Sequence, residues 1–183
     1  MSNSIKDKLL LFRIRVQHDS DAFGKIYDTY VNRIHRFIYF KVSSAEEAED
    51  LTAETFLRLW TYLQEGKPVK YLSALTYQIA RNLVTDYYRT KPERLTLSVD
   101  EQLPEAVGEV TGEERIDRII QTEQVERALR LLKDEYREIL IMRYLDELSP
   151  REIAATIGKA PGATRVMLHR ALQALKSVAD EKK

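Results

Sequence analysis

Residues 148–175 read LSPREIAATIGKAPGATRVMLHRALQAL, a stretch that contains the start and stop signals of two helices. Ser149, the proline after it and Glu152 predict a helix start, because serine caps free N–H groups, proline fits the first helical position and the glutamate bonds back to the cap. Gly158 can adopt the left-handed conformation that ends a helix, and a second helix is expected from near Pro161. This order is that of a helix-turn-helix.

The second helix of this pair has a core face and an outward face. Small or apolar side chains recur at i, i+4, i+7 and i+11 and are expected in the core: Thr164, Leu168, Ala171 and Leu175. The outward face carries the residues that we predict to bind duplex DNA: Arg165, Val166, His169 and Arg170. Arginine bonds guanine O6 and N7 in the major groove, and valine can touch a thymine methyl group. The competing interpretations are solvated helix charges and, for Val166, local packing.

The rest of the chain also has helical periodicity. Apolar residues between positions 20 and 42 recur on one face of a helix: Phe23, Ile26, Tyr27, Tyr30, Ile34, Phe37 and Ile38. A shorter helix before it is predicted from Ile5, Leu9, Phe12 and Val16. Further helices are expected at about 44–63, capped by Ser44 with Glu47, and at about 71–88, 117–132 and 135–144. No alternating strand-like run occurs, so we predict an all-α protein.

Charge divides the chain into three parts, although the formal net charge of the whole is zero. Residues 1–92 carry a net charge of +3, residues 93–126 carry −7 and residues 127–183 carry +4. Prolines and glycines interrupt the acidic part, where helical periodicity also fails. We therefore predict two helical domains joined by an acidic flexible linker: 1–90 for the first domain, 91–116 for the linker and 117–183 for the helix-turn-helix domain. Two basic modules suit a partner that carries phosphates.

Composition excludes several classes of protein. The chain has no cysteine, so it has no disulfide or thiolate metal site, which agrees with a reducing cytoplasm. Residues 1–11 lack the apolar run of a signal peptide, and no stretch approaches the roughly 20 apolar residues of a membrane span. The three histidines lie far apart, and no metalloprotease, phosphate-loop or nucleophile-elbow motif occurs. We expect a cytoplasmic protein that is not an enzyme and uses no metal or cofactor.

Three sets of motifs occur in a particular order. Residues 48–60 read AEDLTAETFLRLW, residues 71–89 include Ile-Ala-Arg-Asn followed by Asp and aromatics, and residues 128–140 precede Leu-Ser-Pro-Arg-Glu-Ile-Ala at 148–154. In these motifs the chain resembles the sigma factors of bacterial RNA polymerase, specifically the small extracytoplasmic-function (ECF) type. The first segment looks like the family's core-polymerase-binding helix, the second like its promoter-melting helix, and the last two like the domain that reads the upstream promoter element.

The resemblance implies sites, partners and a function. The chain is expected to bind core RNA polymerase, to recognise double- and single-stranded promoter DNA and to support strand opening, with an anti-sigma factor as regulator. The implied polymerase-binding residues are Asp50, Glu54, Phe56 and Trp60. The implied single-strand set combines cations with rings on which bases can stack: Lys67, Lys70, Tyr71, Arg81, Asn82, Tyr88 and Arg89. Tyr77 and Tyr87 are expected to pack in the core instead, and burial of Trp60 in its own domain competes with its role as an anchor.

Two departures from the family pattern and two other functions bear on this reading. The family most often has Gln at the position of Ala53, and residues 162–168 read GATRVML where Gly-Thr-Val-Lys-Ser-Arg-Leu is common. One alternative is a stand-alone dimeric helix-turn-helix regulator on half-sites about 34 Å apart. The other is a helical hydrolase that binds a metal through one stripe of a helix, Glu46, Asp50 and Glu54, although the Glu-x-x-His pairs typical of such sites do not occur.

Overall fold

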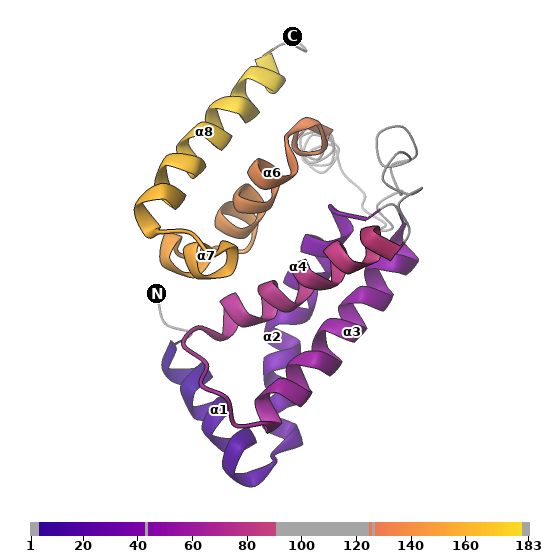
Figure 1. Cartoon of the computed structure of the whole chain (residues 1–183), viewed down its shortest axis with the longest axis vertical. Helices are drawn as coiled ribbons and strands as arrows, with labels where there is room; N and C mark the ends of the chain where they lie inside the picture. The colour runs from indigo at the N-terminus through magenta and orange to yellow at the C-terminus, as the bar shows by residue number, and fades with distance from the viewer. Residues whose placement is uncertain (1–3, 43, 91–124, 126, 181–183) are drawn as a thin grey trace, which may run out of the picture.

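The computed structural model describes residues 4–42, 44–90, 125 and 127–180. Across these residues the chain consists of helices and short connections without a β-strand, so the prediction of two all-α domains is confirmed (Figure 1). The predicted acidic linker and much of the helix expected at 117–132 lie outside the described residues, although 127–131 are helical. No helix in the described part has both the length and the apolar character needed to cross a bilayer.

The first domain consists of four helices: α1 (Ser4–Gln17), α2 (Ser20–Tyr39), α3 (Ala45–Gln64) and α4 (Leu72–Thr90). The α3 helix begins where the sequence predicted, because the Ser44 hydroxyl accepts a hydrogen bond from the Glu47 N–H at 3.2 Å. Helix α2 contacts the other three helices, and its buried face has the predicted period. The apolar residues on that face include Ile26, Tyr30, Ile34, Phe37 and Ile38.

The α1 helix is present where the sequence predicted one, but most of the residues from which it was predicted do not face the core. Leu9, Phe12 and Val16, which marked the helix in the sequence, are exposed. Leu11 and Ile14 are the buried residues that pack against the rest of the domain. Apolar side chains lie on more than one side of α1, so periodicity gives no strong direction to its core face.

The second domain consists of residues 127–131, α6 (Asp134–Leu140), the π-helical turn η3 (Ile141–Leu145), α7 (Pro150–Ile157) and α8 (Pro161–Asp180). The single helix predicted at 135–144 is therefore divided, because its last turn widens into a π-helix. The Asp146 N–H donates to the Ile141 carbonyl at 3.0 Å, a bond that spans five residues. This widening sets the position of Asp146 at the end of the turn.

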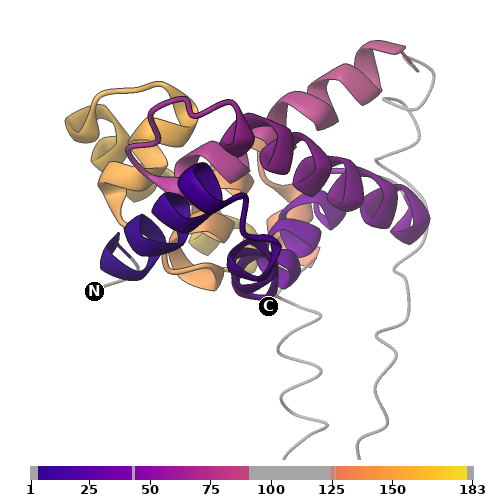
Figure 2. The same ribbon diagram turned by 90° about the horizontal axis from the view of Figure 1, so that it is seen from below.

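The two domains pack against each other, mainly through α4 of the first and α7 of the second. Both views place α7 and α8 together on one side of the α1–α4 group (Figure 1, Figure 2). The contact carries buried polar side chains of both domains, including Tyr77, Glu138 and Asp146. Buried polar groups are unfavourable unless they are paired, so this interface has a defined geometry.

Candidate nucleic-acid and polymerase interfaces

The helix-turn-helix forms as the sequence predicted. The Ser149 hydroxyl accepts from the Glu152 N–H at 3.3 Å, and the Glu152 carboxylate accepts from the Ser149 N–H at 2.9 Å, which completes a capping box. Gly158 ends α7 with a φ of +67°, in the left-handed region that glycine favours. These two local features fix the angle at which α8 leaves the turn.

Helix α8 presents its predicted outward face to solvent. Thr164, Leu168 and Ala171 are buried on the opposite side. All four predicted DNA-binding residues are exposed, and Val166 has 52% of its surface accessible: Arg165, Val166, His169 and Arg170. A helix is about 10–12 Å wide with its side chains, which matches a major groove of about 12 Å. This face therefore has the shape and the charge to enter duplex DNA.

The predicted single-strand residues lie at two separate places along α4. Lys67, Lys70 and Tyr71 precede the helix, and Lys70 Nζ lies 5.6 Å from the centre of the Tyr71 ring. Lys67 forms an ion pair with Glu65 at 2.5 Å, and this carboxylate raises the pKa of Lys67. Asn82 is exposed about three turns further along α4, and 11 residues of helix correspond to about 16 Å. The two groups form a row along α4 rather than a single cluster.

The predicted residues at the end of α4 also have partners within the chain. The Tyr88 hydroxyl donates to the Lys41 carbonyl at 2.6 Å, and burial raises the pKa of Tyr88. Arg89 is exposed and pairs with Asp86 at 3.1 Å on the same helix. Tyr77 and Tyr87 are buried, as their expected place in the core requires.

The α3 surface combines acidic and apolar side chains. Asp50 is exposed, and Glu54 pairs with Arg58 at 2.7 Å. Glu54 and Trp60 line one shallow pocket with Leu57, which is 62% exposed and was not predicted from the sequence. The signal that could have found Leu57 is its place in the helix, because it is an apolar residue that falls outside the core-facing period. Such a mixed surface suits a protein partner.

Two aromatic residues of the predicted polymerase set are partly or wholly withdrawn from this surface. Phe56 is buried, with its ring centre 4.7 Å from that of Tyr27, so its side chain is not available for a direct contact. Trp60 is half-buried, with its ring centre 4.9 Å from that of Phe23. Phe56 therefore positions α3, while Trp60 both packs in its own domain and reaches the pocket.

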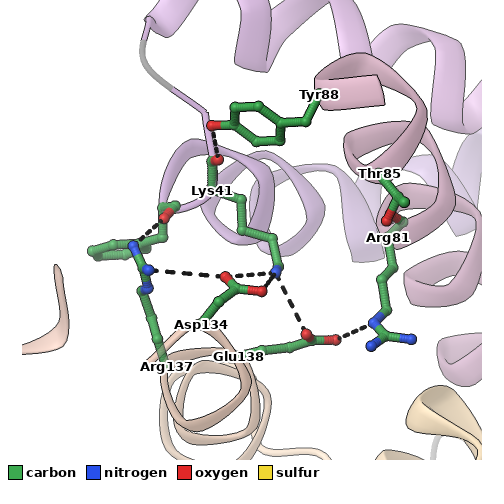
Figure 3. A network of polar contacts seen from close by, with 8 residues as sticks. Lys41, Arg81, Thr85, Tyr88, Asp134, Arg137 and Glu138 are labelled. Atoms are coloured by element: carbon green, nitrogen blue, oxygen red, sulfur yellow. Dashed lines mark hydrogen bonds and ion pairs between the residues drawn. The ribbon is translucent and has the colours of Figure 1, made fainter. Parts of the chain in front are cut away.

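A polar network joins the two domains beside α4 (Figure 3). Lys41 Nζ lies 2.7 Å from an Asp134 oxygen and 3.4 Å from a Glu138 oxygen. The second Glu138 oxygen forms an ion pair with Arg81 Nε at 3.0 Å. Arg137 donates to the carbonyl of Phe40 at 3.0 Å. Arg81, which the sequence placed in the single-strand set, thus holds a carboxylate of the second domain.

A second buried carboxylate of this interface belongs to Asp146, whose side chain has no exposed surface. The Tyr77 hydroxyl donates to Asp146 Oδ2 at 2.6 Å, and Arg36 donates to Oδ1 at 2.5 Å. Burial raises the pKa of Asp146, although both hydrogen bonds oppose this effect. Burial beside this carboxylate also raises the pKa of Tyr77. Sequence reasoning missed this cluster, because its members come together only when the domains dock.

Within the described residues, no three or more His, Cys, Asp or Glu side chains are grouped so that they would hold a metal ion. The stripe of Glu46, Asp50 and Glu54 on α3 is therefore not assembled with further ligands there. The fold and the exposed α8 face instead define a two-domain helical protein of the helix-turn-helix class.

Comparison with known proteins identifies the family. Residues 26–93 match the model of sigma-70 region 2, and residues 122–175 match that of sigma-70 region 4. The chain is 30% identical to the ECF RNA polymerase sigma factor SigM of Bacillus subtilis over 160 residues, which cover 86% of this chain and 94% of SigM. The chain belongs to the ECF RNA polymerase sigma factors, so the stand-alone regulator is not favoured.

Other relatives are consistent with this assignment. The ECF sigma factor BldN of Streptomyces coelicolor is 34% identical over 161 residues, which cover 86% of this chain but only 60% of BldN. In structure, the chain is similar to the sigma factor RpoE of Bartonella quintana, solved with the anti-sigma factor NepR. The TM-score is 0.66 at 20% identity, with 88% of this chain and 98% of that chain covered, and this likeness concerns the fold.

Proposed function

We propose that α8 reads the distal promoter element in duplex DNA, that α4 and the loop before it hold the melted proximal strand, and that α3 binds core RNA polymerase. The observation that carries this proposal is the solvent exposure of the predicted DNA-binding residues of α8, together with the capping box that starts α7 before it. The chain acts in the cytoplasm, where the polymerase is, and the polymerase supplies the chemistry of RNA synthesis.

The roles of α8 and α4 differ because duplex and single strands present different groups. Arg165 and Arg170 can donate hydrogen bonds to base edges or phosphates of duplex DNA, whose bases remain paired. Opening a promoter requires that unpaired bases be trapped, and an exposed amide such as that of Asn82 can bond a flipped base. Lys70 and Tyr71 add a cation beside a ring at the start of the same helix, where a strand can pass.

The polymerase contact is assigned to the pocket on α3. Its lining includes the apolar Leu57, the accessible part of Trp60 and the carboxylate of Glu54. The exposed carboxylate of Asp50 lies outside the pocket on the same helix. A half-buried tryptophan near charged groups is a typical interface anchor. The predicted division into domains at 1–90 and 117–183, with an acidic linker at 91–116, would let both DNA surfaces reach separate promoter elements on one polymerase.

A regulator of this activity is also part of the proposal. The similar RpoE structure contains an anti-sigma factor, and an ECF sigma factor that initiates at chosen promoters needs a means of restraint. We expect an anti-sigma protein to bind this chain as well and to compete with core polymerase or with DNA.

The experiment that tests the function combines the purified chain with sigma-free bacterial core polymerase. Size-exclusion chromatography should show that the two migrate together, and run-off transcription on genomic fragments should give RNA from discrete start sites. A chain that does not join the polymerase, and that shifts duplex DNA as a free dimer, would contradict the proposal and support the stand-alone regulator.

A further inference from the structure

The loop between α3 and α4, residues 65–71, has a stiff first half. Gly66 has a φ of +71°, in the left-handed region that glycine favours. Pro68 fixes its own φ at about −65° and restricts Lys67 before it to extended conformations. Three consecutive residues thus have little backbone freedom, and the direction in which this segment leaves α3 depends on what holds it.

Helix α1 supplies a contact that sets this direction. Figure 1 shows the connection from α3 to α4 running alongside α1, and the Arg15 guanidinium donates a hydrogen bond from Nη2 to the carbonyl oxygen of Lys67. Hydrogen bonds from a charged donor are among the stronger ones in proteins. Further along the loop, Val69 is half-buried against the core. The loop is therefore fixed to α1 at one point and to the core at another.

The α1 helix is itself held firmly enough to position the loop. Ile14, which precedes Arg15, is fully buried, and Leu11 is also buried. Near the start of α1, the Tyr30 hydroxyl donates to the Asp7 carboxylate at 3.2 Å. The Nε atom of Arg15 is buried, so its guanidinium lies against the domain and does not extend into solvent. A shift of this side chain would be passed on to the loop.

The side chains proposed to meet the melted strand follow directly after the anchored segment. Lys70 Nζ lies 5.6 Å from the centre of the Tyr71 ring. The Lys67 side chain turns back toward α3, where it pairs with Glu65 at 2.5 Å and lies 5.3 Å from the centre of the Tyr62 ring. Recognition of one base over another requires groups held within about 0.5 Å of the productive geometry. The position of the loop therefore bears on selectivity.

We propose that Arg15 is a positioning residue that acts through the Lys67 carbonyl and sets the selectivity of the loop for the bases of the melted proximal element. This inference rests on the proposed function of the loop and α4. Arg15 acts here without touching DNA. A direct contact with phosphate would instead strengthen the binding of all sequences alike. The two roles therefore have different effects on selectivity.

The first test measures selectivity with the full chain bound to core polymerase. The templates derive from a promoter found by run-off transcription, are randomised at the proximal element in one pool and at the distal element in another, and carry transcribed barcodes that sequencing reads. Arg15→Ala should reduce the ratio of RNA from preferred and disfavoured bases about fivefold or more in the proximal pool. The same ratio in the distal pool should change less than about twofold.

Two further variants show whether this effect belongs to the hydrogen bond. Lys8→Ala removes an exposed cation of α1 and should leave both ratios within about twofold. Arg15→Lys keeps an N–H donor and should recover part of the lost selectivity. Partial unfolding or the loss of a phosphate contact would lower the RNA yield from every template without changing the ratios. A proximal ratio equal to that of wild type, in an Arg15→Ala variant that circular dichroism shows to be folded, overturns the proposal.

The second test asks, without polymerase, whether Arg15 holds the loop. Limited digestion with trypsin, followed by mass spectrometry, gives the rate of cleavage after the exposed loop residue Lys70. We expect this cleavage to be about threefold faster or more in Arg15→Ala, with cleavage after Lys25 of α2 as the internal reference. An unchanged rate overturns the proposal. If even the wild-type chain does not initiate with polymerase, the proposed function fails, and the digestion still decides whether Arg15 positions the loop.

Discussion

The two helices assigned to DNA, α8 and α4, are presented in different ways. On α8, all four predicted residues are exposed, from Arg165 to Arg170. On α4, Asn82 is exposed, but Arg81 pairs with a carboxylate of the other domain. The DNA-binding face of α8 belongs to one local motif, so its residues are exposed as soon as that motif folds. A surface at a domain contact depends on whether the domains are together or apart.

The largest expected effect comes from removing the exposed cations of α8. Arg165→Ala combined with Arg170→Ala should lower run-off transcription about 30-fold or more, because two base or phosphate contacts of roughly 1–3 kcal/mol each are lost. Co-migration with core polymerase should not change, since neither residue lies on α3. Lys25→Ala, an exposed cation on α2, is the matched control, and equal activity of the double variant and this control would remove α8 from the DNA interface.

The next effect concerns the side of α4 that packs against the second domain. Tyr77→Phe removes the hydroxyl that donates to Asp146 and leaves a buried carboxylate oxygen without this donor. We expect the free energy of unfolding to fall by about 1–3 kcal/mol, measured by urea denaturation. Adding Asp146→Asn should cost less than the sum of the two single changes, because both act on one contact. Strict additivity would mean that the hydroxyl and the carboxylate do not depend on each other.

A smaller effect is expected from the N-cap of α7, the helix that precedes α8 in the helix-turn-helix. Ser149→Ala removes the capping hydroxyl and should lower the free energy of unfolding by about 0.5–2 kcal/mol, with weaker promoter use as a consequence. Ser149→Thr, which keeps a hydroxyl, should recover most of both losses. An alanine variant with unchanged stability and unchanged promoter use would show that the turn geometry is set elsewhere.

The smallest effect is a change in the pH dependence of stability at the α4–α7 contact. Burial alone would raise the pKa of Glu152, but hydrogen bonds from Ser149 and Ser73 outweigh it and hold the pKa below its ordinary value of 4.5. The ionised group therefore contributes stability that is complete above about pH 4.5 and is lost as the pH falls through the lowered pKa. Glu152→Gln should flatten this acidic loss in urea unfolding curves taken at several pH values.

Asp146 provides the internal comparison for this pH series. Its pKa is raised by burial, so its contribution has the opposite sign: it is complete below the ordinary value of 3.8 and declines as the pH rises through the raised pKa. Asp146→Asn should remove this decline. If both variants changed the pH profile in the same direction, the assigned causes of the two shifts would be wrong.

Local signals explain how much of the protein the sequence predicted. The Ser149 cap, Gly158 and the period of α2 act over a few residues, so these elements were predicted near their observed ends. The outward face of α8 came from the same kind of period. By contrast, α1 has no dominant apolar face, and Leu9 and Phe12, from which the helix was predicted, are exposed.

The missed features depend on contacts between residues far apart in the chain. Asp146 has no neighbour in sequence that marks it as buried, and its partners Arg36 and Tyr77 lie in the other domain. Phe56 occupies a position in a family motif that suggested contact with polymerase, but the packing of α2 and α3 buries it. The burial of such residues is decided only when helices that are far apart in the sequence pack against each other.

The π-helical turn Ile141–Leu145 makes the domain contact sensitive to chain length. A π-turn holds one residue more than the α-helical path it replaces. Inserting one further residue there would rotate the chain beyond the turn by about 100°, which would aim the Asp146 side chain away from Tyr77 while leaving the α7 cap intact. The contact between the domains thus depends on the number of residues in this turn as well as on their identity, so an insertion at this turn can disconnect the domains without altering any side chain at the contact.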